Sequence, residues 1–368
     1  MIAFVERLFI VFVSTSLTLL AIEVCVAVVA PQQLILVRGD IWRSDPQFGY
    51  RHRENADTEV NTGERKVRFV TDDFGYRVNS KGTPQTAERA ILVVGDSFVA
   101  GMQVENEETI FGQVEAGLRE KGLDARVDNA GVSGWTPNHY LLEVKRALRS
   151  REYELGIVCL YIGNDVVEKK VSSFYAAEKF VQNTFEIPPS FEWIEIVHAI
   201  LIPLNDILET RSHLFTLMKT RLRPYLVPLM LAKSYHPPVF NIEDTGSRRW
   251  EVTTGICKRI AVQFAERSVP VIFVIIPTIY QVREDLWPDH LALFNIEPAS
   301  VRLSQPNEIL RQTFRSAGLT MFDPLDLMRR EAESGTLLHG TVDPHLNRTG
   351  NRLVAEFMLP TVEAALSK

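Results

Sequence analysis

The sequence has little cysteine: three residues, Cys25, Cys159 and Cys257, in a chain of 368. Their spacings form neither a disulfide framework nor a metal-binding pattern, so we expect unpaired structural thiols, with Cys159 inside a buried strand. Six histidines also show no spacing typical of metal ligands. They are His139, His198, His213, His236, His290 and His339. The sequence therefore predicts no metal site and no cofactor.

An excess of positive charge is also missing. The chain carries 40 Lys and Arg residues against 46 Asp and Glu residues, a formal net charge of -6. Nucleic-acid-binding domains usually show a basic surface, so this balance gives no support to a nucleic-acid partner. No Gly-x-Gly-x-x-Gly follows the first strand of the main domain, which disfavours a dinucleotide site. Internal repeats and low-complexity tracts are absent as well, and the composition is typical of a folded protein.

Ionisable side chains are nearly missing from one run near the N-terminus. Leu8 to Ala30 contains a single one, Glu23, and its 23 residues would span about 35 Å as a helix, slightly more than the hydrocarbon core of a bilayer. The run is too long for a typical signal peptide, and Pro31 disfavours cleavage after Ala30. We favour an uncleaved single-pass anchor over residues 1–30, with a cleaved signal or a buried core helix as alternatives. Glu23 would be costly alone in lipid, so we expect it to face a partner helix or to lie near the membrane interface.

The segment after the anchor, residues 31–88, is polar and rich in turn residues. One alternating stretch, residues 66–71, predicts a strand. We interpret the whole segment as a stalk or as a small β decoration on the main domain. Its Arg38 and Arg43 nearly balance Arg7 on the other side of the anchor, so the positive-inside rule sets no membrane orientation.

Residues 89–368 alternate between strand and helix patterns. Strands are predicted at residues 90–94, 126–129, 155–161, 271–276 and 319–322, and the longer apolar runs suit strands buried on both faces of a parallel sheet. Helical patterns lie at residues 108–121, 137–150, 248–267, 307–316 and 348–366. This alternation predicts an α/β fold in which helices cover both faces of a five-stranded parallel sheet. Residues 171–245 interrupt the alternation, and both a helical insertion packed on the sheet and a membrane-surface or lid element remain open.

Four polar motifs follow the predicted strands or precede the last helix. They are Gly95-Asp96-Ser97, Asn129-Ala130-Gly131-Val132-Ser133-Gly134-Trp135, Gly163-Asn164-Asp165 and Asp343-Pro344-His345. Open α/β sheets place their ligands at the carboxyl ends of the strands, which is where the first three motifs lie. Each motif alone suits a turn or a helix cap equally well. We expect Asp96 and Asp165 to brace their loops by hydrogen bonds.

The residue types in these motifs fit nucleophilic catalysis. A serine hydroxyl is a poor nucleophile near neutral pH unless an imidazole takes its proton and a carboxylate orients that imidazole. Ser97, His345 and Asp343 would supply these groups. Glycine-rich backbone and an Asn amide, as found in the second and third motifs, can donate to a developing oxyanion.

With these four motifs in this order, the chain resembles the SGNH (GDSL-like) hydrolase superfamily, which is named for Ser, Gly, Asn and His in separate blocks. The resemblance covers about residues 89–170 and 247–366. It implies a flavodoxin-like three-layer αβα sandwich with a five-stranded parallel sheet, here joined to an N-terminal transmembrane helix.

The resemblance also implies a role for each matching residue. Ser97 would be the nucleophile, His345 the base and Asp343 the acid that orients it. The oxyanion hole would consist of the backbone N–H groups of Ser97 and Gly134 and the side-chain amide of Asn164. No metal takes part.

One block departs from the usual pattern of the superfamily. The common last block is Asp-x-x-His, whereas Asp343 lies only two positions before His345. Asp323, after the fifth predicted strand, therefore remains a fallback carboxylate. The Asp-x-His spacing is similar to that of membrane-associated SGNH-like proteins linked to O-acetylation of exopolysaccharides such as alginate. In the alginate acetyltransferases the blocks are permuted, so the match is partial.

The function that the resemblance implies is a serine-dependent esterase or O-acyltransferase. It would act on acyl esters, chiefly acetyl esters, through an acyl-Ser97 intermediate, and cell-envelope or exopolysaccharide glycans are candidate substrates. The catalytic domain would be periplasmic or extracellular and tethered to the membrane by the N-terminal helix. The alternative is a membrane-tethered, non-catalytic carbohydrate-binding or assembly subunit that keeps the same fold.

Overall fold

The computed structural model describes residues 2–32, 34, 39–79, 87–166, 207–208, 211–230 and 238–367. Most of the predicted insertion at 171–245 lies outside the described residues, together with Arg38, His198 and His236. The described part of this insertion consists of helix α7 (His213–Met230) and the short turns η2 (Pro238–Phe240) and η3 (Ile242–Gly246). Helix α7 contacts α1 and α10.

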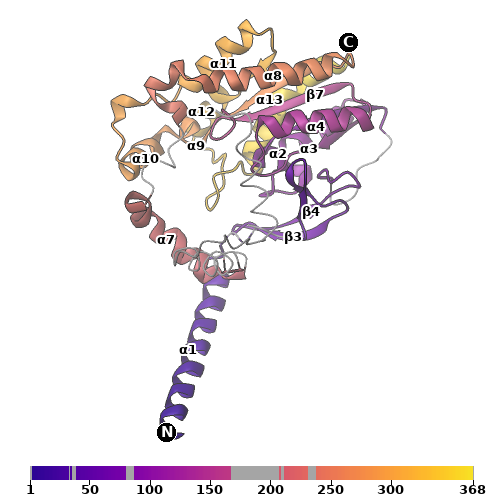
Figure 1. Ribbon diagram of the computed structural model, residues 1–368. Helices are drawn as coiled ribbons and strands as arrows, with labels where there is room; N and C mark the ends of the chain where they lie inside the picture. The colour runs from indigo at the N-terminus through magenta and orange to yellow at the C-terminus, as the bar shows by residue number, and fades with distance from the viewer. Residues whose placement is uncertain are drawn as a thin grey trace, which may run out of the picture.

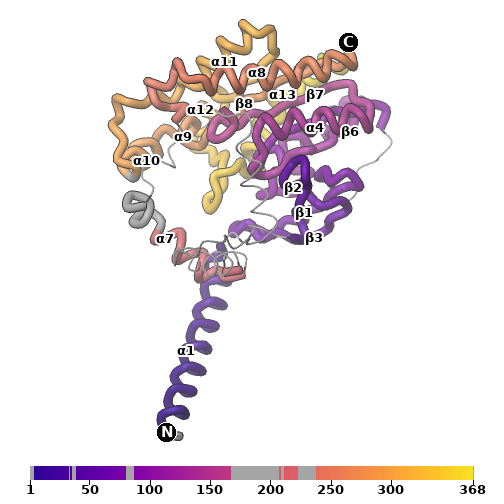
Figure 2. The backbone as a smooth tube through the Cα atoms, in the orientation of Figure 1, coloured from indigo at the N-terminus to yellow at the C-terminus, as the bar shows by residue number. Residues whose placement is uncertain are grey.

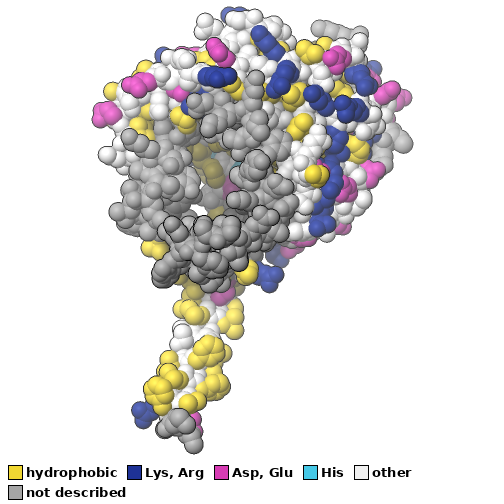
Figure 3. Space-filling model, in the orientation of Figure 1, with side chains coloured by type: hydrophobic (Ala, Val, Ile, Leu, Met, Phe, Trp, Pro, Cys, Tyr) yellow, Lys and Arg dark blue, Asp and Glu magenta, His cyan; other side chains and the backbone are white. Residues whose placement is uncertain are grey.

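The N-terminal apolar run forms a single helix, α1 (Ile2–Val29), that projects from the rest of the molecule (Figure 1). Its window from Phe4 to Val29 is long and apolar enough to cross a membrane, by length and composition. The apolar side chains along it lie on the surface (Figure 3). Pro31 follows closely after its end, where a residue without a backbone N–H cannot continue a helix.

The centre of the molecule is a five-stranded sheet in which every pairing is parallel. Its strands are β5 (Arg89–Val94), β6 (Ala125–Asn129), β7 (Leu155–Tyr161), β8 (Val271–Ile276) and β9 (Met321–Phe322). The spatial order is β6-β5-β7-β8-β9, so the first two strands in the chain exchange places. This is the flavodoxin-like order, and it confirms the predicted fold class.

Two hydrophobic clusters fill the space on the two faces of this sheet. Leu92 and Val94 of β5 belong to one cluster and Ile91 and Val93 to the other, as alternating side chains of a strand require. Helices α4, α8 and α11 contribute to the first cluster, and α3, α12 and α13 to the second. The molecule therefore has the three layers expected from the sequence (Figure 1).

The helices of this domain end close to where the sequence places them. Their bounds are α2 (Ser97–Ala100), α3 (Ile110–Glu120), α4 (Pro137–Ser150), α8 (Arg248–Ala265), α9 (Ile279–Val282), α10 (Trp287–Phe294), α11 (Gln305–Ser316), α12 (Leu325–Glu333) and α13 (Arg348–Leu366). Short turns of 3-10 helix are η1 (Asn106–Glu108), η4 (Glu284–Leu286) and η5 (Pro298–Ser300). The five predicted helices and five predicted strands are confirmed, whereas α2, α9, α10 and α12 were not predicted.

Two antiparallel hairpins precede the sheet: β1 (Trp42–Asp45) pairs with β2 (Gly49–His52), and β3 (Asp57–Asn61) with β4 (Lys66–Val70). Strand β4 is the strand predicted in this segment. We call residues 39–79 the hairpin unit. Its buried Val60 and Phe69 share a cluster with Ala100 and Met102 around the end of α2. In Figure 2 the hairpins lie at the end of the body nearer to α1. The described part of the predicted stalk or decoration thus packs on the main domain, and the domain boundaries themselves stay a prediction.

Candidate active site

Ser97 opens helix α2 immediately after the carboxyl end of β5. Asp96 caps this helix, because its side chain accepts a hydrogen bond from the backbone N–H of Phe98 at 2.9 Å. Gly101 ends the helix in the left-handed conformation at φ 56°, and its N–H donates to the Ser97 carbonyl. The short helix therefore holds Ser97 at the edge of the sheet where ligands of such folds bind.

The loop before α13 brings His345 and Asp343 to this serine. His345 Nε2 lies 2.7 Å from Ser97 Oγ, and His345 Nδ1 makes a short contact with Asp343 Oδ1. The same Asp343 oxygen accepts the backbone N–H of His345 at 2.9 Å. An Asx turn of this kind folds the carboxylate back over two residues, which is how an Asp-x-His spacing can serve the ring. The structure therefore brings together the three side chains that the sequence singled out.

The surroundings of His345 favour its charged form. Burial lowers the pKa of His345, but the hydrogen bond and the negative charge of Asp343, followed by the charge of Asp96, outweigh it and raise the pKa above its ordinary value. An imidazolium next to Ser97 is thus stabilised by a carboxylate on its far side. This is the electrostatic arrangement needed by a base that accepts a serine proton.

The fallback carboxylate Asp323 is engaged elsewhere. It accepts hydrogen bonds from the Asn307 amide at 2.9 Å, from the Arg311 guanidinium at 3.1 Å and from the backbone N–H of Leu325 at 3.1 Å. These contacts tie β9 to α11 and α12. Asp343 is therefore the carboxylate that pairs with His345.

Asp96 and Asp165 brace their loops, as the sequence predicts. Asp96 is buried and accepts one N–H of the Asn164 side chain at 3.2 Å, in addition to capping α2. Asp165 accepts the backbone N–H of Tyr161 at 2.8 Å and the hydroxyl of Tyr140 at 2.9 Å. Burial raises the pKa of both carboxyl groups, and in Asp165 the neighbouring charge of Asp96 adds to this increase.

Asn164 and Gly134 occupy the carboxyl ends of the strands on either side of β5. One N–H of the Asn164 amide donates to Asp96, and among the residues that the structure describes the other meets no protein acceptor. Within the described residues, the backbone N–H groups of Ser97 and Gly134 donate to no protein atom. Their shared role as oxyanion donors stays a prediction.

Gly134 has two reasons to be glycine. Its φ is 79°, a conformation that side chains disfavour, and a Cβ atom there would lie 2.5 Å from the Tyr50 hydroxyl. We call residues 95–104 the serine loop. The loop that carries Gly134 runs beside it, since Val132 N–H donates to the Gly95 carbonyl at 3.2 Å. A change at Gly134 would therefore disturb the region next to Ser97.

The hairpin unit supplies contacts that sequence reasoning missed. The Tyr50 hydroxyl donates to the Ser133 carbonyl at 2.6 Å, and the Trp135 indole N–H donates to the Tyr50 carbonyl at 3.1 Å. These bonds hold the loop of Gly134 from outside the sheet. They join residues more than eighty positions apart, so no local pattern could have indicated them.

Arg77 makes the corresponding contact with the serine loop. Its buried guanidinium donates to the carbonyls of Ala100 at 2.7 Å and Val104 at 2.5 Å, and also to that of Gly101. Burial lowers the pKa of Arg77 to about 10, so the group stays charged at neutral pH. One guanidinium thus donates to the last carbonyl of α2 and to two carbonyls after it.

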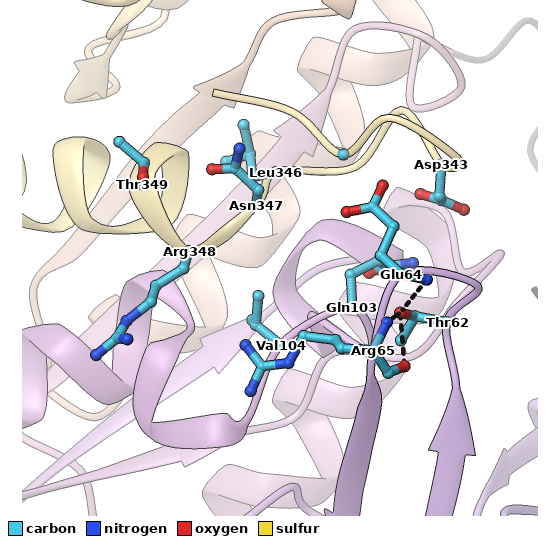
Figure 4. Close-up of a pocket in the computed structure, with 11 residues that line it drawn as sticks. Thr62, Glu64, Arg65, Gln103, Val104, Asp343, Leu346, Asn347, Arg348 and Thr349 are labelled. Atoms are coloured by element: carbon cyan, nitrogen blue, oxygen red, sulfur yellow. Dashed lines mark hydrogen bonds between the residues drawn. The ribbon is translucent and has the colours of Figure 1, made fainter. Parts of the chain in front are cut away.

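One aromatic ring packs against the base. The Phe98 ring lies between His345 and Tyr161, with centroid distances of 4.5 Å and 4.2 Å. A planar wall on this side limits the rotation of the imidazole. A cavity of about 280 Å³ lies beside the acid, where Glu64, Asp343 and Arg348 are among its lining residues (Figure 4).

None of the three cysteines belongs to the contact series of Ser97, His345 and Asp343. Cys25, Cys159 and Cys257 are all free, as predicted, and Cys159 is buried in β7. Burial raises the pKa of the Cys159 and Cys257 thiols, which keeps them protonated. Among the described residues, no group of three or more His, Cys, Asp or Glu side chains could hold a metal ion.

Comparisons with known proteins give similarities in structure alone. No family model and no curated protein matches the chain. Among solved structures, TesA is 11% identical, with a TM-score of 0.39 and coverage of 75% of this chain and 99% of its own. The acetyl xylan esterase AlAXEase is 13% identical, with a TM-score of 0.40 and coverage of 74% and 99%. A member of the lipolytic protein G-D-S-L family from Veillonella parvula is 12% identical, with a TM-score of 0.38 and coverage of 74% and 97%.

The chain thus shares a distant structural similarity with an acetyl xylan esterase and with a member of the lipolytic protein G-D-S-L family. At these identities and TM-scores, its fold class rests on its own strand order and its chemistry on its own side chains.

Proposed function

We propose that this protein is a serine-dependent enzyme that acts on ester bonds through an acyl-Ser97 intermediate. The observation that supports it best is the continuous series of contacts from Ser97 Oγ to His345 and on to Asp343. A serine that only capped a helix, or an aspartate that only braced a loop, would not need both contacts. A serine just after a buried strand, an imidazole and a carboxylate, each in contact with the next, suit the activation of a hydroxyl nucleophile.

The proposed reaction has two halves. His345 Nε2 takes the proton from Ser97 as Oγ attacks the ester carbonyl carbon, and Asp343 stabilises the imidazolium. The tetrahedral intermediate collapses, the ester C–O bond breaks, and His345 returns the proton to the leaving alcohol. His345 then takes a proton from water or from an acceptor hydroxyl, whose oxygen attacks the acyl carbon. The bond between that carbon and Ser97 Oγ breaks, His345 returns the proton to Oγ, and a carboxylic acid or a new ester leaves.

The developing oxyanion would be held by the N–H groups of Ser97 and Gly134 and by the Asn164 amide. Asp96 supports this role for Asn164, because it accepts one amide hydrogen and so fixes the direction of the other. Loss of one such donor typically lowers turnover by about 10²–10³-fold.

The proposed substrate is a short acyl ester, chiefly acetyl, on a cell-envelope or exopolysaccharide glycan. The Asp-x-His spacing and the apolar helix α1 support this choice. Hydrolysis and O-acyl transfer use the same protein groups and differ only in the acceptor that reaches the acyl-enzyme.

We also propose that α1 is a permanent membrane anchor, with the catalytic domain outside the cytoplasm. Glu23 in α1 faces α7, where it accepts hydrogen bonds from the Ser212 hydroxyl at 2.6 Å and from the backbone N–H groups of His213 at 2.6 Å and Leu214 at 3.0 Å. Cleavage after Ala30 would remove this cap and expose the helix end. The protein should therefore keep residues 1–30 and stay in carbonate-washed membranes. A mature protein that lacks residues 1–30 would contradict the anchor.

The catalytic proposal is tested by labelling full-length protein with an alkyl fluorophosphonate. We expect stoichiometric labelling of Ser97, which Ser97→Ala abolishes together with hydrolysis of nitrophenyl acetate. Ser150→Ala, at an exposed serine that ends α4, is the matched control and should react as the wild type does. A folded wild-type protein that neither labels nor hydrolyses the ester would favour the non-catalytic binding subunit instead. Addition of a glycan acceptor then separates transferase from hydrolase.

A further inference from the structure

We propose that Glu64 of the hairpin unit is a positioning residue that holds the loop presenting Asp343 to His345. The proposal rests on the acyl-transfer function described above and adds to it a residue outside the α/β sheet. Glu64 lies in the turn between β3 and β4, which is distant in the sequence from the loop of Asp343 and His345.

Three donors of the loop converge on one oxygen of Glu64. Glu64 Oε1 accepts the backbone N–H of Val342 at 2.7 Å and the hydroxyl of Thr341 at 3.1 Å, and it also contacts the backbone N–H of Thr341. Val342 directly precedes Asp343. A shift of the Val342 peptide would therefore move the Asp343 carboxylate away from the imidazole.

In the described part of the chain, the backbone–backbone hydrogen bonds of this loop lie at its base, so the contact with Glu64 is what supports the backbone of Thr341 and Val342. Gly340 N–H donates to the His345 carbonyl at 2.9 Å, and the Asn347 amide donates to the His339 carbonyl at 3.1 Å. Gly340 also permits the close approach, because a Cβ atom there would lie 2.8 Å from Glu64 Oε1. The tip of the loop thus rests on Glu64 while its two ends are joined to each other.

The turn that carries Glu64 is closed by hydrogen bonds and is flanked by buried side chains. The Thr62 hydroxyl and backbone N–H both donate to the Arg65 carbonyl at 2.9 Å and so close the turn. Val60 and Val67 on the flanking strands are fully buried. Figure 4 shows the Glu64 side chain directed from this turn towards the loop that carries Asp343. The turn can therefore hold Glu64 in place, and Glu64 in turn can hold the loop that carries Asp343.

The effect of Glu64 must come through geometry rather than through its charge. Its side chain is exposed, so water and salt screen its field at the imidazole. The charged groups that face His345 are Asp343 and Asp96, with His339 close by. A glutamine keeps the acceptor oxygen without the charge, whereas an alanine removes the acceptor.

The experiment compares Glu64→Ala, Glu64→Gln and a matched control in the full-length protein. The control is Glu59→Ala, at an exposed glutamate of the same hairpin that pairs with Lys66. We expect Glu64→Ala to lower the rates of nitrophenyl acetate hydrolysis and fluorophosphonate labelling by about 10–100-fold, since small displacements of positioning groups can have effects of this size. The acid limb of the pH–rate profile should move to lower pH, because a displaced Asp343 raises the His345 pKa less. Glu64→Gln should stay within about threefold of the wild type, as expected when the bonding acceptor is retained.

Hydrogen exchange gives a readout that does not need activity. Peptides covering residues 338–346 should lose protection in Glu64→Ala and keep it in Glu64→Gln and Glu59→Ala. Unchanged exchange, or an unchanged acid limb and rate in a Glu64→Ala protein, would overturn the positioning role. A glutamine variant as impaired as the alanine variant would overturn the geometric explanation. If the wild-type protein were inactive and Glu64→Ala still lost protection in these peptides, the loop contact would be supported and the proposed catalytic function rejected.

Discussion

The four loops that carry the site residues and the hairpin unit contribute to the site in different ways. The loops after β5, β6 and β7 and the loop before α13 carry every group that we propose to react. The hairpin unit carries none of these groups, yet it contacts three of the four loops. Arg77 holds the serine loop, Tyr50 the glycine loop and Glu64 the loop of the acid and base.

This difference separates the placement of a residue from its alignment. A parallel sheet brings the carboxyl ends of its strands to one edge, so the reacting groups share a neighbourhood whatever lies around them. Catalysis needs side chains held within about half an ångström of a productive arrangement, which loops rarely achieve without support. In this protein the support comes from residues 39–79.

Among variants that keep Ser97, the largest effect on turnover is expected in the loop before α13, from Asp343→Asn. The asparagine amide would favour the wrong tautomer of His345, and turnover should fall by about 10³–10⁴-fold, as it does when the carboxylate of such a triad is neutralised. Because Asp343 raises the pKa of His345, the acid limb of the residual activity should also move to lower pH. The measurement is kcat/KM for nitrophenyl acetate between pH 5 and 9.

The control for that change is Asp323→Asn, which removes the charge of the fallback carboxylate. It should lower stability through Arg311 and leave the pH profile unchanged. If Asp323→Asn abolished turnover and Asp343→Asn did not, the assignment of the acid would be wrong.

A smaller effect on turnover is expected in the hairpin unit, from Arg77→Met. The change leaves the last carbonyl of α2 and two carbonyls after it without the guanidinium donors, and the free energy of unfolding should fall by about 3 kcal/mol or more. Turnover in the folded fraction should fall by roughly 10–100-fold as Ser97 loses its alignment. Denaturant unfolding and active-site labelling measure the two quantities separately.

Arg68→Met is the matched control for Arg77→Met. Arg68 is an exposed arginine on β4 that pairs with Asp57 at 2.6 Å, so its loss should change stability little. Equal turnover per folded molecule in Arg77→Met and wild type would show that the hairpin unit stabilises the fold without aligning the site.

The groups that we propose to react could be found in the sequence because their signals are local. Each lies at a fixed place relative to an apolar strand or a helix start, and hydrophobic periodicity identifies those elements from a few neighbouring residues. The three-layer architecture followed from the same pattern, and its strand order from the resemblance. Even the unusual Asp-x-His spacing could be noted, although only the structure showed that an Asx turn lets Asp343 reach the ring.

The bracing residues gave no comparable signal. Tyr50 and Ser133 are 83 positions apart, and Glu64 and Val342 are 278 apart. Such pairs meet only after the hairpins have packed around α2, and an exposed glutamate in a turn resembles many others. The sequence also does not indicate that Glu23 bonds to the start of α7, a contact that depends on how α7 packs against α1.

The sequence by itself determined the layered α/β fold, the apolar N-terminal helix and the positions of Ser97, His345 and Asp343 along the chain. These follow from short-range periodicity and from residue chemistry, both of which can be recognised in the amino-acid sequence alone. Tertiary structure alone decided which carboxylate meets the imidazole and which residues hold the loops still. Those outcomes depend on contacts between distant segments, and such contacts exist only once the chain has packed.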